Sequence, residues 1–591
     1  MKPAFFMQAS SPLKSNRKRM KMTKKAITLS LGLVVMGSAS FAQNLSDAKK
    51  AIDAEQYAKA TSMLKSLVSS QAGKGENYFN LGDVYLHNEY VDSAKAVFTK
   101  GIAADPKYAL NYVGLGHVDL ATNNAASAKT NFDKAIGLAS KKDHTPYLYI
   151  GKAYLEQDKP DFAAALTNLT KADEVDAADK DPETFLALGD LYAAQKKNSE
   201  ALSNYLRALN INEGLVRAKV QIGRMYKESR AFPESETQLK EVITADPNYG
   251  PAYREIAELY MQWANFEPAH YDEKSKQALE NYKKYMDLTD KSFDTRLRYA
   301  QFLFYAKDFK ALETETADIA KLYPNNQKTL VINRLQAYSA AENKSPESLK
   351  LLTDFFAKNA DTSRLIAADY LYLGKAQLVA NQDSAALISI RKAIAKDSTN
   401  VEALEDVGKA LYTNKKYDQA AAVYKDAIKL NPNGKGSLTN YYYLASADYF
   451  DYANKDRDKK NPAKTILVEA DSALAHLNKV SPEFTLAYIM RARVARLMDD
   501  QTNPKGLLVP YYEQYLDLVT VKKPELGAAE AEKRNLVEAY TNLGFAYTPT
   551  DKAKAGDYFK KALAIDPANA NALAGAKQLA APAAKAPSKK K

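Results

Sequence analysis

The stretch NYFNLGDVYLHN, residues 77–88, places large apolar residues at helical spacing around a single glycine. Tyr78, Leu81 and Tyr85 are separated by three and four residues, so they fall on one side of an α-helix. A glycine that cradles phosphate would follow a strand and have further glycines beside it, and Gly82 has no glycine neighbour. The stretch therefore predicts an amphipathic helix rather than a nucleotide-binding turn.

The same setting returns along the chain. Four more glycines follow at intervals of 34, 35, 38 and 34 residues, namely Gly116, Gly151, Gly189 and Gly223. A second amphipathic segment comes after each glycine, as in SAKAVFTKGIAADP (residues 93–106), where Ala94, Phe98 and Gly101 share a face and Pro106 ends the helix. Each unit is therefore predicted to be a helix, a short turn and a second helix.

This pattern resembles the tetratricopeptide repeat, which carries a large residue, Leu, Gly and an aromatic residue on helix A, then Ala, an aromatic residue and Ala on helix B, and a closing Pro. The resemblance implies an all-α, right-handed superhelical solenoid of antiparallel helix pairs, with about 12–14 repeats in this chain. Gly82 would let helix A approach helix B at Ala94, while Tyr78, Tyr85 and Phe98 would fill the space between neighbouring repeats. The predicted structural repeat glycines are Gly82, Gly116, Gly151, Gly189, Gly223, Gly374, Gly408 and Gly544.

The repeats are expected to form one solenoid over residues 43–580, because a stack adds core repeat by repeat. The pattern is strongest over residues 75–250, 367–434 and 537–570. Degenerate or insertion-bearing units occupy residues 251–366 and 435–536, and the repeat register is not assigned near 327–360 and 485–520. Insertions at 263–277, 451–464 and 498–506 are expected to enlarge the turn between helices A and B.

The N-terminal residues 1–42 read as a secretory signal peptide. A basic segment precedes the apolar run AITLSLGLVVMG (residues 26–37), which is far shorter than the roughly 20 residues that a spanning helix needs. Cleavage is expected after Ala42, and Met1, Met20 and Met22 are alternative starts. With no cysteine in the sequence, the chain has no lipoprotein anchor site, so it is predicted to be periplasmic or secreted without a transmembrane anchor in its mature form.

The charge of +12 comes from the two ends of the chain. Residues 1–42 hold eight of the 83 basic residues and none of the 71 acidic ones, which leaves 75 basic residues against 71 acidic ones. The Ala/Pro/Lys tail at 581–591, predicted to be disordered, holds four more lysines, so the solenoid itself is neutral. A neutral solenoid lacks the basic excess that nucleic-acid binding requires, and no nucleic-acid partner is predicted.

No motif for catalysis is present. The five histidines show no HExxH or similar metal-ligand spacing, and no protease-like or glycosidase-like signature frames the carboxylates. No catalytic residue, metal or cofactor is therefore predicted, and the sequence argues against an enzyme. Its oligomeric state cannot be inferred.

In proteins that carry this repeat, partner segments usually lie in a concave groove lined by the A helices. The resemblance places the candidate groove at Phe79, Asp83, Leu86, His87, Val113, His117, Leu120, Leu148, Lys152, Leu155, Leu186, Asp190 and Arg224. A ladder of mixed charge runs along this groove, and its members could pair with those of adjacent helices or bind a ligand: Asp83, His117, Lys152, Asp190, Arg224 and Glu258. Apolar residues at Phe79, Val113 and Leu148 make a chaperone-type carboxylate clamp unexpected.

A second candidate surface is the aromatic patch of Tyr442, Tyr449 and Phe450, beside the insertion at 451–464. Aromatic rings could stack on sugars or grip a peptide, although tyrosines at helical spacing are also typical core residues. The leading hypothesis is a non-catalytic interaction scaffold of the bacterial cell envelope, whose partners are other envelope proteins or peptide segments. The alternative is an envelope adaptor that binds cell wall or glycan.

Overall fold

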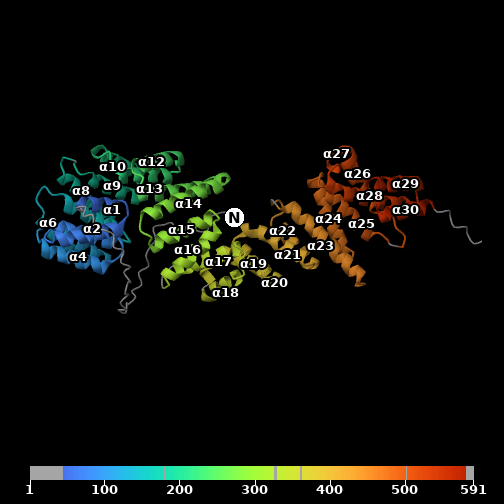
Figure 1. The fold of residues 1–591 in the computed structure, drawn as a ribbon, viewed down its shortest axis with the longest axis horizontal. Coiled ribbons are helices and arrows are strands. Elements are labelled where there is room, and N and C mark those ends of the chain that lie inside the picture. The colour runs from blue at the N-terminus through green and yellow to red at the C-terminus, as the bar shows by residue number, and fades with distance from the viewer. Residues whose placement is uncertain are drawn as a thin grey trace, which may run out of the picture. The chain divides into compact units, whose positions relative to one another are not determined.

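The computed structural model describes residues 44–178, 180–324, 329–359, 362–434, 436–500 and 502–580. Over these residues the chain forms 30 α-helices joined by turns and short 3-10 or π segments, and no strand (Figure 1). It divides into two compact units, Met1–Ser339 (unit 1) and Ala340–Lys591 (unit 2). The predicted signal peptide and the predicted disordered tail lie outside the described residues.

Unit 1 consists of helices that pack in consecutive pairs, each pair an A helix followed by a B helix. Its helices are α1 (Leu45–Asp53), α2 (Tyr57–Ser70), α3 (Gly75–His87), α4 (Val91–Ala104), α5 (Leu110–Ala121), α6 (Ala125–Leu138), α7 (Thr145–Leu155), α8 (Phe162–Val175), α9 (Pro182–Ala194), α10 (Asn198–Ile211), α11 (Val216–Glu228), α12 (Phe232–Ala245), α13 (Gly250–Phe266), α14 (Tyr271–Leu288), α15 (Phe293–Tyr305) and α16 (Phe309–Leu322). Helix α17 (Thr329–Glu342) crosses the boundary between the units.

Unit 2 repeats the same arrangement. Its helices are α18 (Ser348–Lys358), α19 (Ala367–Val379), α20 (Asp383–Lys396), α21 (Ala403–Thr413), α22 (Tyr417–Leu430), α23 (Ser437–Arg457), α24 (Thr465–Val480), α25 (Thr485–Met498), α26 (Val509–Asp517), α27 (Pro524–Gly527), α28 (Lys533–Tyr547), α29 (Lys552–Ile565) and α30 (Ala570–Ala580). A π segment, Leu518–Lys522, follows α26. The prediction of an all-α solenoid of helix pairs is confirmed.

The repeat glycines bring two helices against one aromatic ring. Phe98 of α4 is fully buried, and a Cβ atom added at Gly82 of α3 or at Gly114 of α5 would lie 2.4 Å from its Cε1 atom. The Phe98 ring therefore packs between the A helix of its own repeat and the A helix of the next repeat. The side chain nearest to such a Cβ at Gly82 is therefore Phe98, one turn further along α4 than Ala94. At the corresponding glycines 151 and 374, the carbonyl oxygens of Ala165 and Ala386, which are equivalent to Ala94, also lie 3.3 Å away.

The other seven predicted repeat glycines also face a large side chain of their own B helix. The pairs are Gly116 with Phe132, Gly151 with Leu169, Gly189 with Tyr205, Gly223 with Leu239, Gly374 with Ile390, Gly408 with Tyr424 and Gly544 with Phe559. These distances leave no space for a side chain at the glycine, since each added Cβ would lie within 3.0 Å of its partner. The same contact, between a glycine of helix A and a large side chain of helix B, therefore sets the helix pairing in both units.

Most turns between helices A and B share one backbone conformation. In unit 1, Glu89 has φ +60° and its N–H donates to the carbonyl of Leu86, while Tyr90 N–H donates to Tyr85. Lys196 and, in unit 2, Lys415 occupy the same place at φ +61° and +60°. This left-handed residue ends helix A and satisfies its last carbonyl groups.

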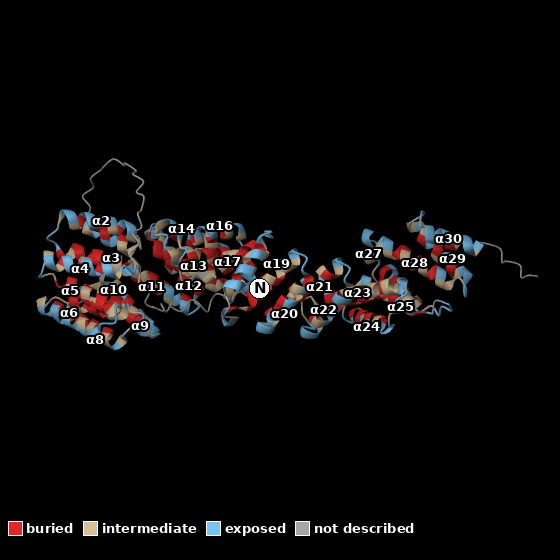
Figure 2. Cartoon of the chain, turned by 90° about the horizontal axis from the view of Figure 1, so that it is seen from below, coloured by how far each residue is buried: buried red, intermediate tan, exposed pale blue. Residues whose placement is uncertain are grey.

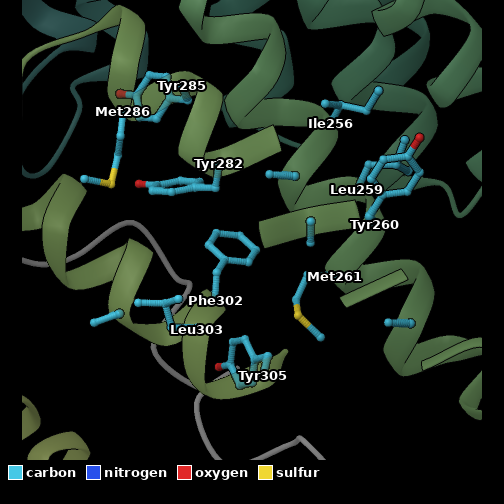
Figure 3. Packing of buried hydrophobic residues seen from close by; sticks show 14 of the residues in the cluster. Ile256, Leu259, Tyr260, Met261, Tyr282, Tyr285, Met286, Phe302, Leu303 and Tyr305 are labelled. Atoms are coloured by element: carbon cyan, nitrogen blue, oxygen red, sulfur yellow. The ribbon is translucent and has the colours of Figure 1, made fainter. Parts of the chain in front are cut away.

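Apolar side chains between successive helices form the core, and Figure 2 shows the buried residues as stripes on the helices. The largest cluster of unit 1 lies among α13, α14 and α15, where the rings of Tyr282 and Phe302 have centroids 4.7 Å apart (Figure 3). Met261, Leu303 and Tyr305 pack around them. Neighbouring repeats thus bury clusters of side chains between them.

Two insertions lengthen helices instead of making long loops. Residues 263–277 extend α13 to Phe266 and begin α14 at Tyr271, with one 3-10 turn between them. Residues 451–457 likewise complete the last turns of α23. The third insertion is a loop, and the Asp499 carboxylate organises it by accepting hydrogen bonds from the backbone N–H groups of Lys505, Gly506 and Leu507 at 2.8–3.0 Å.

Candidate partner-binding surfaces

The predicted groove residues lie on α3, α5, α7, α9 and α11 of unit 1, but its large apolar members are partly core. Phe79, Val113, Leu148 and Leu186 expose only 2–4% of their surface. The Phe79 ring meets Tyr149 of α7 edge to face, with centroids 5.0 Å apart, so it spans from the second repeat to the fourth. The structure therefore places these four predicted groove residues in the core. Leu86, Leu120 and Leu155 are half-buried.

Little room remains between these A helices. A cavity of about 10 Å³ lies among α3, α5 and α7, lined by Asp83, His117 and Lys152 among others. One water molecule needs roughly 10–15 Å³, so this space holds no more than a single water. A partner segment could enter here only if the helices moved apart.

The ladder of charged residues forms its contacts with residues outside the ladder. The His87 ring lies 3.6 Å from Asp83, its neighbour one turn earlier, and Asp190 accepts a hydrogen bond of 2.8 Å from the Tyr205 hydroxyl. Arg224 pairs with Glu228 at 3.0 Å, and Glu258 pairs with Arg298 of α15. None of these direct contacts joins adjacent rungs, although the charges of Lys152 and Arg224, the rungs on either side of Asp190, act to lower its pKa.

Burial and local charge shift the acid–base equilibria on this face. Burial lowers the pKa of His117 and raises that of Asp190 to about 6, although the Tyr205 hydroxyl opposes the second shift. Burial would lower the pKa of His87, but the Asp83 carboxylate outweighs it and raises that pKa to about 9. At neutral pH this inner face therefore carries a protonated His87 beside an ionised Asp83.

The first repeat closes unit 1 by contacting a part of the chain roughly 200 residues away. The turn between α1 and α2 places Glu55 against α13 and α14, where Arg254 Nη1 donates to both carboxylate oxygens at 2.6 Å. The Tyr285 hydroxyl donates to the same carboxylate at 2.8 Å, and Ala58 N–H donates to Asp290 at 2.7 Å. In Figure 1 the blue α1 lies beside the green α13. We call this contact the closure.

Further charged residues surround the closure. Asp53, at the end of α1, lies 3.2 Å from Arg217 of α11. Glu255 accepts from Lys227 at 2.7 Å, and although burial opposes it, Lys227 and Arg254 lower the pKa of Glu255 to about 2. Charged partners of both signs therefore compensate one another where the first repeat meets α11, α13 and α14.

Unit 2 has an open cavity on the face formed by its last A helices. Its volume is about 740 Å³, within the range of ligand-binding pockets, and residues of α23, α25, α28 and α30 line it. Tyr449, Val537, Phe545 and Ile565 supply its apolar wall. We call it the unit 2 cavity.

Charged residues of both signs also line the unit 2 cavity, and basic ones predominate. The basic members are Arg493, Arg496, Lys533 and Arg534, and the acidic members are Glu538 and Asp566. Arg493 Nε donates to Glu538 at 2.7 Å, and the Tyr512 hydroxyl donates to the same oxygen at 2.9 Å. Glu538 is thus held by two donors of its own unit.

The fold keeps two members of the predicted aromatic patch in contact, because the rings of Tyr449 and Phe450 meet edge to face at 5.2 Å. Tyr449 lines the unit 2 cavity. Phe450 stacks on Tyr417 with centroids 5.3 Å apart, and Tyr442 meets Phe484 edge to face at 5.5 Å. The structure therefore brings only Tyr449 of the three to the cavity wall, and the other two pack against rings of neighbouring helices.

Two segments of the chain match profiles of a known repeat. Sequence profiles of the tetratricopeptide repeat match residues 75–108 and residues 371–435. The first match begins with α3 of unit 1, and the second covers α20, α21 and α22 of unit 2. The chain contains tetratricopeptide repeats (TPRs). Repeats of this kind are typical of protein–protein interaction scaffolds, which are in general non-catalytic.

Several solved TPR structures are similar to parts of this chain. The C-terminal part of a TPR protein from Cytophaga hutchinsonii is 26% identical, covering 47% of this chain and 98% of that one at a TM-score of 0.37. A TPR protein from Parabacteroides merdae is 17% identical over 45% of this chain and 99% of that one, with a TM-score of 0.30. A chain of the APC/C hetero-tetramer Cut9–Hcn1 is 17% identical, covering 89% of this chain and 93% of that one at a TM-score of 0.28. No curated protein matches the sequence.

The TPR register could have led to the unit 2 cavity. Relative to Tyr78 and Gly82, the predicted groove positions Phe79 and Asp83 each lie one residue later. The same step from Tyr540 and Gly544 gives Thr541 and Phe545, and both line the cavity. Arg493 and Arg496 could not be found this way, because they fall where the repeat pattern decays.

Over the described residues, no group of three or more His, Asp or Glu side chains is arranged to hold a metal ion. No helix within the same residues is both long enough and apolar enough to span a membrane.

Proposed function

We propose that this TPR-containing protein is an exported scaffold of the bacterial cell envelope that binds a segment of a partner protein in the unit 2 cavity. The size and lining of that cavity carry the proposal. Its volume is about 740 Å³, and it has an apolar wall and a charged rim, so it can accommodate several side chains of a bound segment. Phe545 is 40% exposed there, which leaves an aromatic anchor available to a partner.

The envelope location is supported by the basic and apolar run that precedes Ser40-Phe41-Ala42. Mass spectrometry of the protein from a periplasmic fraction should find Gln43 as the first residue. A dominant species that begins at Met20 or Met22 would overturn the export part of the proposal.

The binding part is tested by photo-crosslinking in cells. A photoreactive phenylalanine analogue placed at Phe545 of the full chain should form adducts with partner proteins. The same analogue at Val468, which is 49% exposed on α24 and does not line the cavity, is the matched control. Equal adducts at both positions, or none at Phe545, would contradict a site in the unit 2 cavity.

The same experiment separates a protein partner from a cell-wall partner. Adducts that survive muramidase digestion and contain a second polypeptide support the scaffold. Recovery of the protein only with insoluble cell wall, and its release by muramidase without any adduct, would favour a glycan-binding adaptor instead.

A further inference from the structure

The unit 2 cavity keeps an excess of positive charge after its internal contacts are counted. Of its two acidic residues, Glu538 is held by Arg493 and the Tyr512 hydroxyl. Asp566 accepts hydrogen bonds from Ala568 N–H at 3.1 Å and from the Asn569 side chain at 3.3 Å, at the turn that leads into α30. Both carboxylates are therefore engaged within the unit.

The basic residues on α28 are not compensated in the same way. Arg534 has no hydrogen bond or ion pair with any described residue. The neighbouring Lys533 pairs at 2.6 Å with Glu530, whose side chain is 84% exposed, so solvent weakens that pair. A guanidinium with free donors beside an exposed ammonium favours a carboxylate as its ligand.

A buried hydroxyl on the same helix also lacks a partner. Thr541 is 6% exposed, and its Oγ1 atom has no hydrogen bond within the described part of the chain. Thr541 lines the cavity two turns after Arg534. Since a buried polar group without a partner costs free energy, an acceptor brought by a ligand would relieve that cost.

We propose that the unit 2 cavity binds an acidic segment of the partner protein, with its carboxylates at Arg534 and Lys533 and an apolar side chain against Val537 and Phe545. This proposal rests on the proposed function and names the chemistry of its partner. Charge complementarity selects the occupant, because a basic segment would place like charges against uncompensated arginine and lysine. The apolar wall favours a peptide over a bare polyanion.

The test uses two synthetic peptides and the mature chain, residues 43–591. Fluorescence anisotropy with the labelled acidic peptide EEDWEEDLEE should show saturable binding that weakens as salt rises, and the basic peptide KKRWKKRLKK should not bind. A single-stranded oligonucleotide of equal charge is the third probe. Tighter binding of the oligonucleotide than of the acidic peptide would overturn the proposal.

Charge reversal locates the site. The double variant Lys533→Glu, Arg534→Glu should weaken binding of the acidic peptide by about tenfold or more, because two attractive contacts become repulsive. The control Lys429→Glu, Lys560→Glu changes the net charge equally at exposed residues outside the cavity, and its affinity should stay within about twofold of the parent. Equal losses in both double variants would overturn the proposal. Arg534→Gln, a milder change, should give an intermediate loss.

Failure of this inference can be told from failure of the proposed function. If Phe545 forms partner adducts in cells while the acidic peptide does not bind, the cavity is a binding site for a segment of other chemistry, and the inference alone is wrong. If neither adducts nor peptide binding are found, both are wrong.

Discussion

Units 1 and 2 are built from the same repeat, yet their A-helix faces differ in the space that they leave. In unit 1 the rings of Phe79 and Tyr149 meet across three repeats, and the cavity beside them holds about 10 Å³. In unit 2 the corresponding face of α23, α25, α28 and α30 encloses about 740 Å³. The repeat pattern thus fixes how helices pair, whereas the side chains that follow each repeat glycine decide whether a groove stays open.

The two units also differ in how their ends are held. Unit 1 joins its first repeat to α13 and α14 through the closure, and unit 2 ends in α30, which packs on α28 and α29. A stack of repeats is usually stabilised only by contacts between neighbours. The closure adds a contact between distant repeats, so unit 1 is expected to unfold more cooperatively than a simple stack.

The largest effect is expected from filling the glycine contact, which both units share. Gly116→Leu places a Cβ atom 2.3 Å from the Phe132 ring in unit 1, and Gly544→Leu places one 2.6 Å from the Phe559 ring in unit 2. Each should cost about 3 kcal/mol or more, because a packed ring cannot move aside. Thermal unfolding followed by circular dichroism measures both.

Gly137→Ala is the control for this comparison. No atom lies within 4 Å of a Cβ at this helical position, so alanine should stabilise α6 by about 0.5–1 kcal/mol through its higher helix propensity. Melting temperatures of the two leucine variants close to that of the parent would show that the glycine contact does not set helix pairing.

A smaller effect is expected from breaking the closure, which only unit 1 has. Arg254→Ala leaves the Glu55 and Glu255 carboxylates without their shared arginine, and should cost about 2 kcal/mol, less than a fully buried pair because these groups are partly exposed. Hydrogen exchange should become faster in α1 and α2.

The control for the closure is an exposed arginine of unit 2. Arg457 is 74% exposed and lies 3.7 Å from Asp458, so Arg457→Ala should leave exchange unchanged throughout. Unchanged exchange of α1 and α2 in Arg254→Ala would mean that the first repeat is held by its neighbours alone.

The units should respond to pH in different windows. Burial, reinforced by the Glu469 carboxylate, raises the pKa of Asp448 in unit 2 to about 7, although Lys425 opposes the shift. The folded unit therefore binds one more proton than the unfolded chain between about pH 4 and 7, and stability falls as pH rises through this window. Asp448→Asn should remove this dependence and stabilise unit 2 by about 1–2 kcal/mol at pH 8.

Unit 1 should show its own pH dependence at higher pH. The raised pKa of His87, about 9, contributes stability that is complete below about pH 6.5 and is lost as pH rises through 9. His87→Gln should flatten the melting temperature between pH 7 and 9, and Asp448→Asn should not. The same slope in His87→Gln as in the parent would show that the Asp83 pair does not influence stability.

The smallest effect is expected at the turns, where the units agree. Lys196→Gly in unit 1 and Lys415→Gly in unit 2 replace residues with φ near +60°, and each should stabilise its unit by about 0.5–1 kcal/mol. Lys95→Gly, inside α4, should instead destabilise by about 1 kcal/mol. A loss of stability at either turn would show that the lysine side chain contributes there.

Much of the fold could be predicted because the repeat is a local pattern. The glycines at 82, 116, 151, 189, 223, 374, 408 and 544 all meet a large residue of their own B helix, as the helical spacing required. The exposure of groove residues could not be predicted in the same way. Phe79 is buried because Tyr149, two repeats later, reaches it, and no spacing within one repeat contains that information.

The closure and the basic wall of the unit 2 cavity could be recognised only in the folded chain. The closure joins Glu55 to Arg254, and nothing in the turn sequence around Glu55 differs from a solvated turn. The basic wall of the unit 2 cavity comes from α25, where the repeat pattern has decayed, and from α28, where the pattern is clear. Extending the groove register to Tyr540 would have found the second half of this wall.

The closure also has a consequence for the time at which unit 1 can finish folding. Glu55 and Arg254 are separated by 199 residues, and Ala58 and Asp290 by 232. At a synthesis rate of about 5–20 residues per second, the first repeat leaves the ribosome roughly 10–50 s before the residues that hold it. During this interval the carboxylate of Glu55 faces water with no arginine beside it. The first repeat is therefore synthesised first, but its contact with α13 and α14 can form only after these two helices have been made.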